Sequence, residues 1–301
     1  MLEKLTKMDG LGSSSGFLLV FLIYSAGSQR AGFFPCPLSC FSGSFCPDFA
    51  LGLGLSVVLQ EGQRILEEIL RAGLAELGLD CDEQALDRFR RYYEILEEQN
   101  KVMNLTAIRD PAQAARLHIV DALELLRTGD LRGKTVLDVG TGGGIPGVVL
   151  KLAQPELHLT LLDATAKKLD WLRQLLPALG VSAEFILGRA EEAIIDHREQ
   201  YDVATARAVS RLNALCELCL PYVKVGGLFL AMKGPEADQE LAEAKEAIRT
   251  LGAKARPLHR YQLPVTEDGG GEQRTVVVLE KTAPTPAQYP RRWAKIKDTP
   301  L

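Results

Sequence analysis

Residues 136–147 read VLDVGTGGGIPG, and this stretch decides the fold of the chain. Its apolar start favours a buried strand, and a loop rich in glycine follows. A glycine-rich turn after a strand lets the backbone approach a bound nucleotide closely. Dinucleotides, nucleoside triphosphates and S-adenosylmethionine are all bound at such turns, so the neighbouring residues have to identify the ligand.

From Lys134 onward the sequence alternates between strand and helix patterns. The expected strands are 134–140, 157–163, 183–188, 201–207 and 228–234, then two near 256–264 and 274–281. Helical patterns separate the first five strands, which predicts an α/β fold with a mostly parallel sheet covered on both faces. A helix near 236–251 precedes the last two strands, which we expect to form an antiparallel hairpin at the edge of a seven-stranded sheet.

Three segments upstream of the sheet have apolar residues at helical spacing: 57–79, 82–102 and 111–127. Asp82 and Asp110 are the expected N-caps of the second and third helices, and Pro111 suits a first helical position. These helices predict an N-terminal helical cap over residues 56–132, followed by the α/β domain over residues 133–283.

Residues 1–55 lack the texture of the later sequence, and we expect them to be a non-native or disordered extension. Their apolar run 17–24 is far shorter than the roughly 20 residues of a membrane helix, so no membrane association is expected. Cys216 and Cys219 stand in an apolar helical pattern, which indicates buried thiols and no metal site. The cysteines form no disulfide framework, which fits a reducing cytoplasm.

The residues around the glycine loop distinguish its ligands. A triphosphate-binding loop needs Lys and then Ser or Thr after its last glycine, but Val148 and Val149 follow Gly147. Asp163 ends the second strand and suits the ribose of either remaining ligand. Asp138 would repel a pyrophosphate and suits the cationic S-adenosylmethionine, unless it is only a hydrogen-bonded carboxylate at the strand end.

Two turns bear on the reaction. KVGG at 224–227 precedes the fifth strand, a turn common in class I S-adenosylmethionine methyltransferases, and it agrees with the loop and the acid after strand two. The fourth strand ends in TARAVSRL at 205–212. This segment contains neither the Asn/Asp-Pro-Pro-Tyr clamp used in amino methylation nor the Pro-Cys nucleophile used in carbon methylation of pyrimidines.

Over about residues 58–301 the chain resembles the RsmG family of small-subunit ribosomal RNA methyltransferases, also called glucose-inhibited division protein B. The segments that carry the resemblance are NLTAIRDP (104–111), HIVDALEL (118–125), VLDVGTGGGIPG (136–147), LLDATAKKLDWL (161–172), GRAEEA (188–193), YDVATARAVSRL (201–212), LPYVKVGGLFLAMKG (220–234) and YPRRWAKIKDTPL (289–301). The resemblance implies transfer of a methyl group from S-adenosylmethionine to N7 of guanine 527, in the 530 loop of 16S rRNA.

The resemblance also implies the cofactor contacts. Gly140 and Ile145 would line the loop side, Asp163 would bind the ribose, and Ala190 with Glu191 would bracket the adenine. Three more candidates are Asp138, Gly142 and Arg207, the last at the mouth of the site. Guanine N7 carries a free lone pair, so no general base is required and no catalytic residue is assigned beyond Arg207 as a candidate.

The net charge of −4 does not indicate nucleic-acid binding, so any basic surface has to be local. The candidates for RNA contact are Lys233, Arg274, Arg291, Arg292, Lys295 and Lys297. The last four lie in a basic tail, residues 284–301, that is expected to grip the RNA backbone. Trp293 in that tail is suited either to stacking on a base or to packing. His118 and Asp121 share a helix face and indicate either closure of the site or a buried pair.

We therefore expect a cytoplasmic, monomeric rRNA (guanine-N7) methyltransferase acting on the 30S subunit or an assembly intermediate. Two alternatives remain at this stage. One is a class I methyltransferase for a small molecule or a protein, which the basic tail disfavours. The other is a module that binds cofactor or RNA without turnover, which the intact loop motif disfavours.

Overall fold

The computed structural model describes residues 47–79, 82–263 and 271–301. Gly52–Leu301 forms one compact unit, the second along the chain, and it contains the features discussed below. Most of the expected extension, residues 1–46, lies outside the described residues. The first helix, α1 (Pro47–Glu76), begins well before the expected residue 57. None of the helices in the described part of the chain combines the length and apolar composition that a bilayer span requires.

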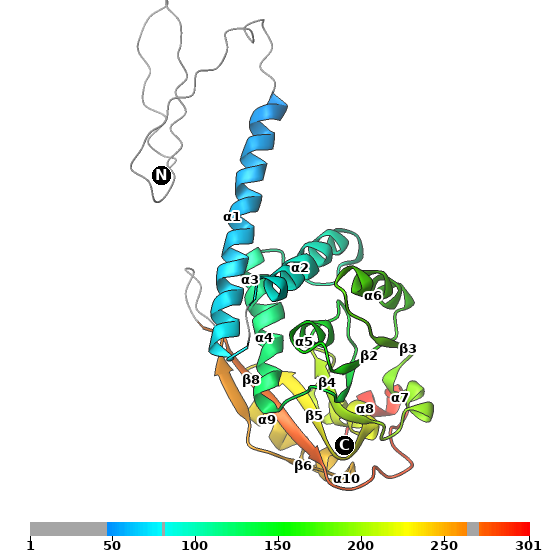
Figure 1. The fold of residues 1–301 in the computed structure, drawn as a ribbon. Helices are drawn as coiled ribbons and strands as arrows, with labels where there is room; N and C mark the ends of the chain where they lie inside the picture. The colour runs from blue at the N-terminus through cyan, green and yellow to red at the C-terminus, as the bar shows by residue number, and fades with distance from the viewer. Residues whose placement is uncertain (1–46, 80–81, 264–270) are drawn as a thin grey trace, which may run out of the picture. The chain divides into compact units, whose positions relative to one another are not determined.

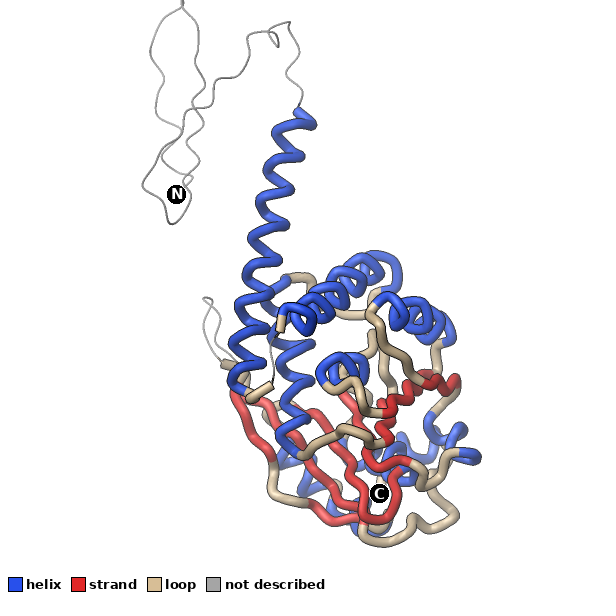
Figure 2. The backbone as a smooth tube through the Cα atoms, in the orientation of Figure 1, coloured by secondary structure: helices blue, strands red, loops and turns tan. Residues whose placement is uncertain are grey.

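One sheet forms the centre of the second unit (Figure 2). Its strands are β1 (Thr135–Val139), β2 (His158–Asp163), β3 (Glu184–Leu187), β4 (Tyr201–Arg207), β5 (Val223–Lys233), β6 (Ala253–Ala255), β7 (His259–Gln262) and β8 (Gln273–Lys281). The order is β3-β2-β1-β4-β5-β8-β6, with β7 also paired to β8. The first five strands are parallel and β8 is antiparallel to β5, which confirms the expected fold class. Between β1 and β4 the strand order reverses, and ligands bind at such a switch point.

The sheet differs from the sequence prediction at two places. At the edge, where one strand was expected near residues 256–264, the structure has two, β6 and β7. They lie on either side of Pro257 in the sequence and pair with successive parts of β8. Proline has no N–H to donate, so it interrupts a ladder of hydrogen bonds. The expected KVGG turn is instead part of β5, which begins at Val223 and carries a wide irregularity opposite β4.

The sheet separates two cores, because successive side chains of each strand point to opposite faces. Val136 belongs to the first core and Leu137 to the second. Helices α1, α2 (Glu83–Met103), α5 (Gly147–Ala153) and α6 (Ala166–Ala178) supply the first core. Helices α7 (Ala190–Ala193), α8 (Leu212–Cys219), α10 (Lys245–Thr250) and α11 (Trp293–Asp298) supply the second. The helix expected near 236–251 is divided at Ala244 into α9 (Ala237–Glu243) and α10.

Both N-cap residues predicted for the N-terminal helices are confirmed. The Asp82 side chain accepts a hydrogen bond from the Ala85 N–H at 2.6 Å, and Asp110 accepts one from Gln113 at 2.8 Å. The third helical segment runs through α3 (Pro111–Ala114), a π-helical turn (Ala115–Val120), α4 (Asp121–Leu123) and a 3₁₀ turn (Glu124–Thr128). The π-helical turn, which lies between α3 and α4 (Figure 1), was not expected.

Helix α2 supports the glycine loop directly. The Tyr92 hydroxyl is buried and donates to the Gly143 carbonyl at 2.9 Å. A Cβ atom at Gly143 would lie 3.1 Å from the Leu96 side chain, so the helix and the loop are in close contact. The cap therefore helps to fix the loop that the sequence marks as the ligand site.

We expect Tyr92→Phe to lower the free energy of unfolding by about 1–3 kcal/mol, because the buried Gly143 carbonyl would lose its partner. The matched control is Tyr93→Phe, since the Tyr93 hydroxyl is buried without a hydrogen-bond partner among the described residues. Urea denaturation followed by circular dichroism measures both. Equal effects of the two substitutions would contradict the role given to the Tyr92 hydroxyl.

Candidate functional site

The glycine loop bends back over the ends of β1 and β2. The backbone N–H groups of Gly140 and Thr141 both donate to the Leu162 carbonyl, at 2.8 and 3.1 Å. Gly140 has φ of 72°, in the left-handed region that favours glycine. A Cβ atom there would also lie 2.8 Å from a methyl group of Val209. Both the positive φ of Gly140 and the nearby methyl group of Val209 therefore require glycine at this position.

Asp138 lies beneath the loop and is fully buried. Its Oδ2 accepts hydrogen bonds from the Thr141 hydroxyl at 2.7 Å and from the Gly147 N–H at 3.0 Å. Its Oδ1 is buried and has no partner among the described residues. Burial raises the pKa of Asp138 to about 6, although the two hydrogen bonds oppose this shift. The carboxylate thus links the two ends of the loop through Oδ2, and Oδ1 remains without a hydrogen bond among the described residues.

A cavity of about 210 Å³ opens beside the loop, and we call it the loop cavity. Its lining residues are Val139, Gly140, Leu162, Asp163, Ala164, Gly188, Arg189, Ala190, Glu191, Val209, Leu218 and Trp293. Four of the predicted cofactor residues meet here: Gly140, Asp163, Ala190 and Glu191. Asp138 and Ile145 are buried and do not line the loop cavity, so neither is placed to touch a ligand there.

Asp163 is held in a fixed orientation at the wall of the loop cavity. Its Oδ2 accepts from the Gly142 N–H at 3.0 Å, and its Oδ1 accepts from the Thr165 N–H at 2.8 Å. Each oxygen of an ionised carboxylate can accept a second hydrogen bond. Asp163 and Glu191 therefore offer acceptors for hydroxyl groups, and Gly142 takes part through its backbone.

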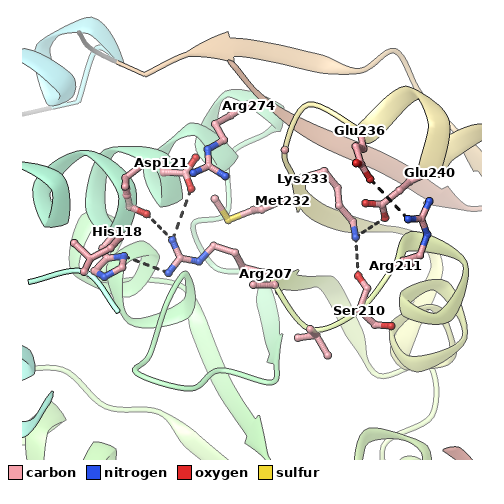
Figure 3. A pocket seen from close by; sticks show the side chains of 15 residues that line it. His118, Asp121, Arg207, Ser210, Arg211, Met232, Lys233, Glu236, Glu240 and Arg274 are labelled. Atoms are coloured by element: carbon pink, nitrogen blue, oxygen red, sulfur yellow. Dashed lines mark hydrogen bonds and ion pairs between the residues drawn. The ribbon is translucent and has the colours of Figure 1, made fainter. Parts of the chain in front are cut away.

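A second cavity of about 600 Å³ lies next to the first, and Val209 lines both. We call it the arginine cavity (Figure 3). Its lining residues are Ile108, Leu117, His118, Asp121, Arg207, Ala208, Val209, Ser210, Arg211, Met232, Lys233, Gly234, Glu236, Glu240 and Arg274. It brings together the cap and the ends of β4, β5 and β8, and with them three predicted cations: Arg207, Lys233 and Arg274.

Arg207 occupies the centre of the charged groups in the arginine cavity (Figure 3). Its Nη1 donates to the Leu117 carbonyl at 2.6 Å and lies 3.7 Å from Asp121 Oδ2. Its Nη2 lies 3.4 Å from His118 Nδ1. The π-helical turn supplies both Leu117 and His118, so this turn sets the position of the guanidinium.

His118 is buried, and its Nε2 lies 2.9 Å from the Thr106 hydroxyl. Burial and the nearby Arg207 cation lower the pKa of His118 to about 4. The ring is therefore neutral near pH 7. One interpretation of the sequence was a buried pair of His118 and Asp121, but the two side chains do not bond each other. Arg207 lies between them, and the Tyr261 hydroxyl donates to Asp121 at 2.6 Å. Burial raises the pKa of Asp121.

The other predicted RNA-contacting cations differ in their surroundings. Lys233 is nearly buried, and its Nζ lies 2.8 Å from Glu240 Oε2 and donates to the Ser210 carbonyl at 2.8 Å. Arg274 pairs with Glu272 at 2.8 Å, while its Nε is buried without a partner among the described residues.

The tail divides into anchored and exposed cations. Arg291 forms a close ion pair with Glu217. Arg292, Lys295 and Lys297 are exposed and make no ion pair within the described part of the chain. Cys216 and Cys219 are fully buried, as the sequence indicated.

Sequence reasoning missed several residues of the two cavities. Val209 separates them, Leu218 lines the loop cavity from α8, and Tyr261 orients Asp121. Val209 stands in the quoted segment TARAVSRL but was not singled out, and no local motif marks Leu218 or Tyr261, which reach the site through the fold. Trp293 was noted in the sequence, but its place in the loop cavity was not foreseen.

Comparison with known proteins identifies the family. The family model described as rRNA small subunit methyltransferase G matches residues 85–265. The ribosomal RNA small subunit methyltransferase G of Pelotomaculum thermopropionicum is 40% identical over 241 residues, covering 79% of this chain and 99% of the relative. That of Bacillus licheniformis is 40% identical over 238 residues, covering 78% and 98%.

The chain belongs to the rRNA small subunit methyltransferase G family. It is a methyltransferase, and its methyl donor is S-adenosylmethionine. Among solved structures, the chain is similar to M. jannaschii TYW2 in complex with AdoMet, with a TM-score of 0.43 and 10% identity over 55% of this chain and 76% of that one.

The residues of the loop cavity fit this cofactor. Carboxylates suit the ribose hydroxyls, and apolar walls suit the adenine. Asp138 places a negative charge beneath the loop, which suits a sulfonium cation.

We expect the affinity for S-adenosylmethionine to fall by about tenfold between pH 7.5 and pH 5, because Asp138 takes up a proton below its pKa of about 6 and loses its charge. Calorimetric titration at a series of pH values measures this change. Asp138→Asn should bind more weakly at pH 7.5 and show little dependence on pH. S-adenosylhomocysteine, which lacks the sulfonium charge, is the matched ligand control and should vary less. Affinity of the unmodified chain that is constant over this range would contradict the prediction.

Proposed function

We propose that this chain methylates N7 of guanine 527 in 16S rRNA, within the 30S subunit or an assembly intermediate, as a monomer in the bacterial cytoplasm. The observation that carries the proposal is the junction of the two cavities at Val209. One cavity has the acceptors and apolar walls for the cofactor. The other has the cations for an RNA acceptor.

The residues of the arginine cavity suit a guanine presented by a phosphate backbone. Arg207 and Arg274 line it from β4 and β8, and the neutral His118 adds no charge. Guanidinium groups bind phosphate and can donate to guanine O6 while the N7 lone pair stays free. Arg207 is already held by Leu117 and Asp121, so the guanidinium is oriented before RNA binds.

Catalysis in this proposal depends mainly on how the methyl donor and guanine N7 are positioned. S-adenosylmethionine supplies an activated methyl group on a sulfonium, and guanine N7 needs no deprotonation. The cavities of this chain would bring the two reactants together and exclude water, which contributes several kcal/mol to catalysis without a general base. Arg207 is therefore expected to position the acceptor, and no side chain of the site is expected to transfer a proton.

The experiment that tests the function is methyl transfer from radiolabelled S-adenosylmethionine to 30S subunits from a strain that lacks its own enzyme. Digestion and mass spectrometry then identify the labelled nucleotide. A single 7-methylguanosine in the 530 loop is the expected product. Label on a small molecule or a protein, or cofactor binding without any label, would establish one of the alternative functions instead.

We expect Arg207→Lys to lower kcat/KM for 30S subunits by about 10-fold to 100-fold, because one ammonium cannot replace the planar donors of the guanidinium. This substitution keeps the charge beside the buried Asp121, so the fold is retained. The control is Arg260→Lys, an exposed cation of β7 paired with Asp238. Equal activity of the two variants would show that Arg207 does not contact the acceptor.

The exposed cations of the tail generate a separate prediction. Replacing Lys295 and Lys297 with Ala should weaken binding to 30S subunits and reduce the slope of log affinity against log salt by about one or two, since each phosphate contact releases counterions. Filter binding at several salt concentrations measures the slope. The control replaces Lys254, an exposed lysine of β6 paired with Glu280. An unchanged slope in the tail variant would remove the tail from the RNA interface.

A further inference from the structure

The C-terminal segment returns to the core of the domain. After β8 the chain continues through residues 282–292 into α11, which packs on α8 (Figure 1). Ile296 of α11 is fully buried in the second core. The segment that the sequence suggested as a basic tail for RNA is therefore attached to the fold along part of its length.

An ion pair anchors this segment. Glu217 of α8 is fully buried. It accepts hydrogen bonds from the Arg291 backbone N–H at 2.7 Å, from Nε at 2.8 Å and from Nη2 at 2.6 Å. The remaining Nη1 of Arg291 donates to the Thr299 carbonyl at 3.1 Å, beyond α11. A single guanidinium thus joins α8 to both ends of α11, and a buried carboxylate left without such a partner is costly.

The same anchor brings an aromatic ring to the loop cavity. Trp293 stands two residues after Arg291, at the start of α11, and lines that cavity. Leu218, the residue after Glu217, lines it as well. Glu217 of α8 therefore anchors the C-terminal segment, and the next residue, Leu218, forms part of the wall of the loop cavity. Asp163 and Glu191 provide polar groups in the same lining.

We propose that Trp293 is a cofactor-positioning residue, which forms a wall for the adenine of S-adenosylmethionine and is held in place by the ion pair between Glu217 and Arg291. An indole ring presents a large apolar face, and bases stack on such faces with little dependence on hydrogen bonds. The inference rests on the cofactor site proposed above, but not on the identity of the RNA acceptor.

The sequence suited Trp293 either to stacking on an RNA base or to packing, and its place in the loop cavity adds a third use, a wall for the cofactor. A ring that lines the cofactor cavity changes cofactor affinity when no RNA is present. A ring that stacks only on an RNA base changes RNA binding alone. Binding of S-adenosylhomocysteine to the full chain without RNA separates these cases.

The experiment uses the two tryptophans of the chain. Trp171 lies in α6 within the first core and lines neither cavity, so Trp171→Phe leaves Trp293 as the only tryptophan, which is excited selectively over the tyrosines at long wavelength. Saturating S-adenosylhomocysteine should then change the fluorescence of Trp293. By calorimetry, Trp293→Ala should bind about tenfold more weakly, and Trp293→Phe should retain most of the affinity because a ring remains.

The anchor is tested in the Trp171→Phe background. Arg291→Lys keeps the charge opposite Glu217 but removes the fork of donors, so α11 should loosen while the fold persists. The Trp293 emission should shift to longer wavelength, and affinity for S-adenosylhomocysteine should fall by about threefold or more.

The outcomes are separable. Unchanged affinity in Trp293→Ala, with binding by the parent chain intact, overturns this inference and leaves the cofactor site standing. Failure of the parent chain to bind S-adenosylhomocysteine overturns the cofactor site together with the inference. Unchanged emission and affinity in Arg291→Lys would show that the ion pair does not hold Trp293 in place.

Discussion

The site depends on the carboxylate of Asp138, which is buried at the end of β1 and accepts hydrogen bonds from both ends of the glycine loop. These two bonds join the two ends of the loop, whose glycines impose little conformation of their own. The loop in turn orients Asp163 through the Gly142 N–H and limits the space beside Val209. One buried acid thus determines where two cavities lie and where they meet.

The charges of the site are arranged so that a chain with net charge −4 can receive a polyanion. Its cations are fixed by the fold before any ligand arrives. Arg207 lies between Asp121 and His118, and Lys233 lies against Glu240. Such partners lower the entropy that is lost on binding, but they also neutralise part of the charge. In the proposed function the exposed cations of α11 would compensate by acting at longer range, where salt screens them.

Much of the fold could be predicted because strand and helix patterns alternate clearly, and four of the predicted cofactor residues line one cavity because each stands in a recognisable motif. The remainder depends on contacts across the chain. The π-helical turn at Ala115–Val120 has nearly the periodicity of an α-helix, so no pattern reveals it. The basic tail looked like a free RNA-binding arm because its sequence does not show Glu217 buried opposite Arg291. The approach of Tyr261 to Asp121 likewise arises only when β7 pairs with β8.

The interruption at Pro257 has a consequence for how copies of this chain meet. The last edge of the sheet consists of β6 and β7, two very short strands separated by a residue that cannot donate a hydrogen bond. Lys254 and Arg260 project from them and are exposed. A neighbouring strand would find only brief runs of unpaired backbone groups there, next to positive charge. The break therefore limits how much of this edge is open to pairing with a strand of another chain.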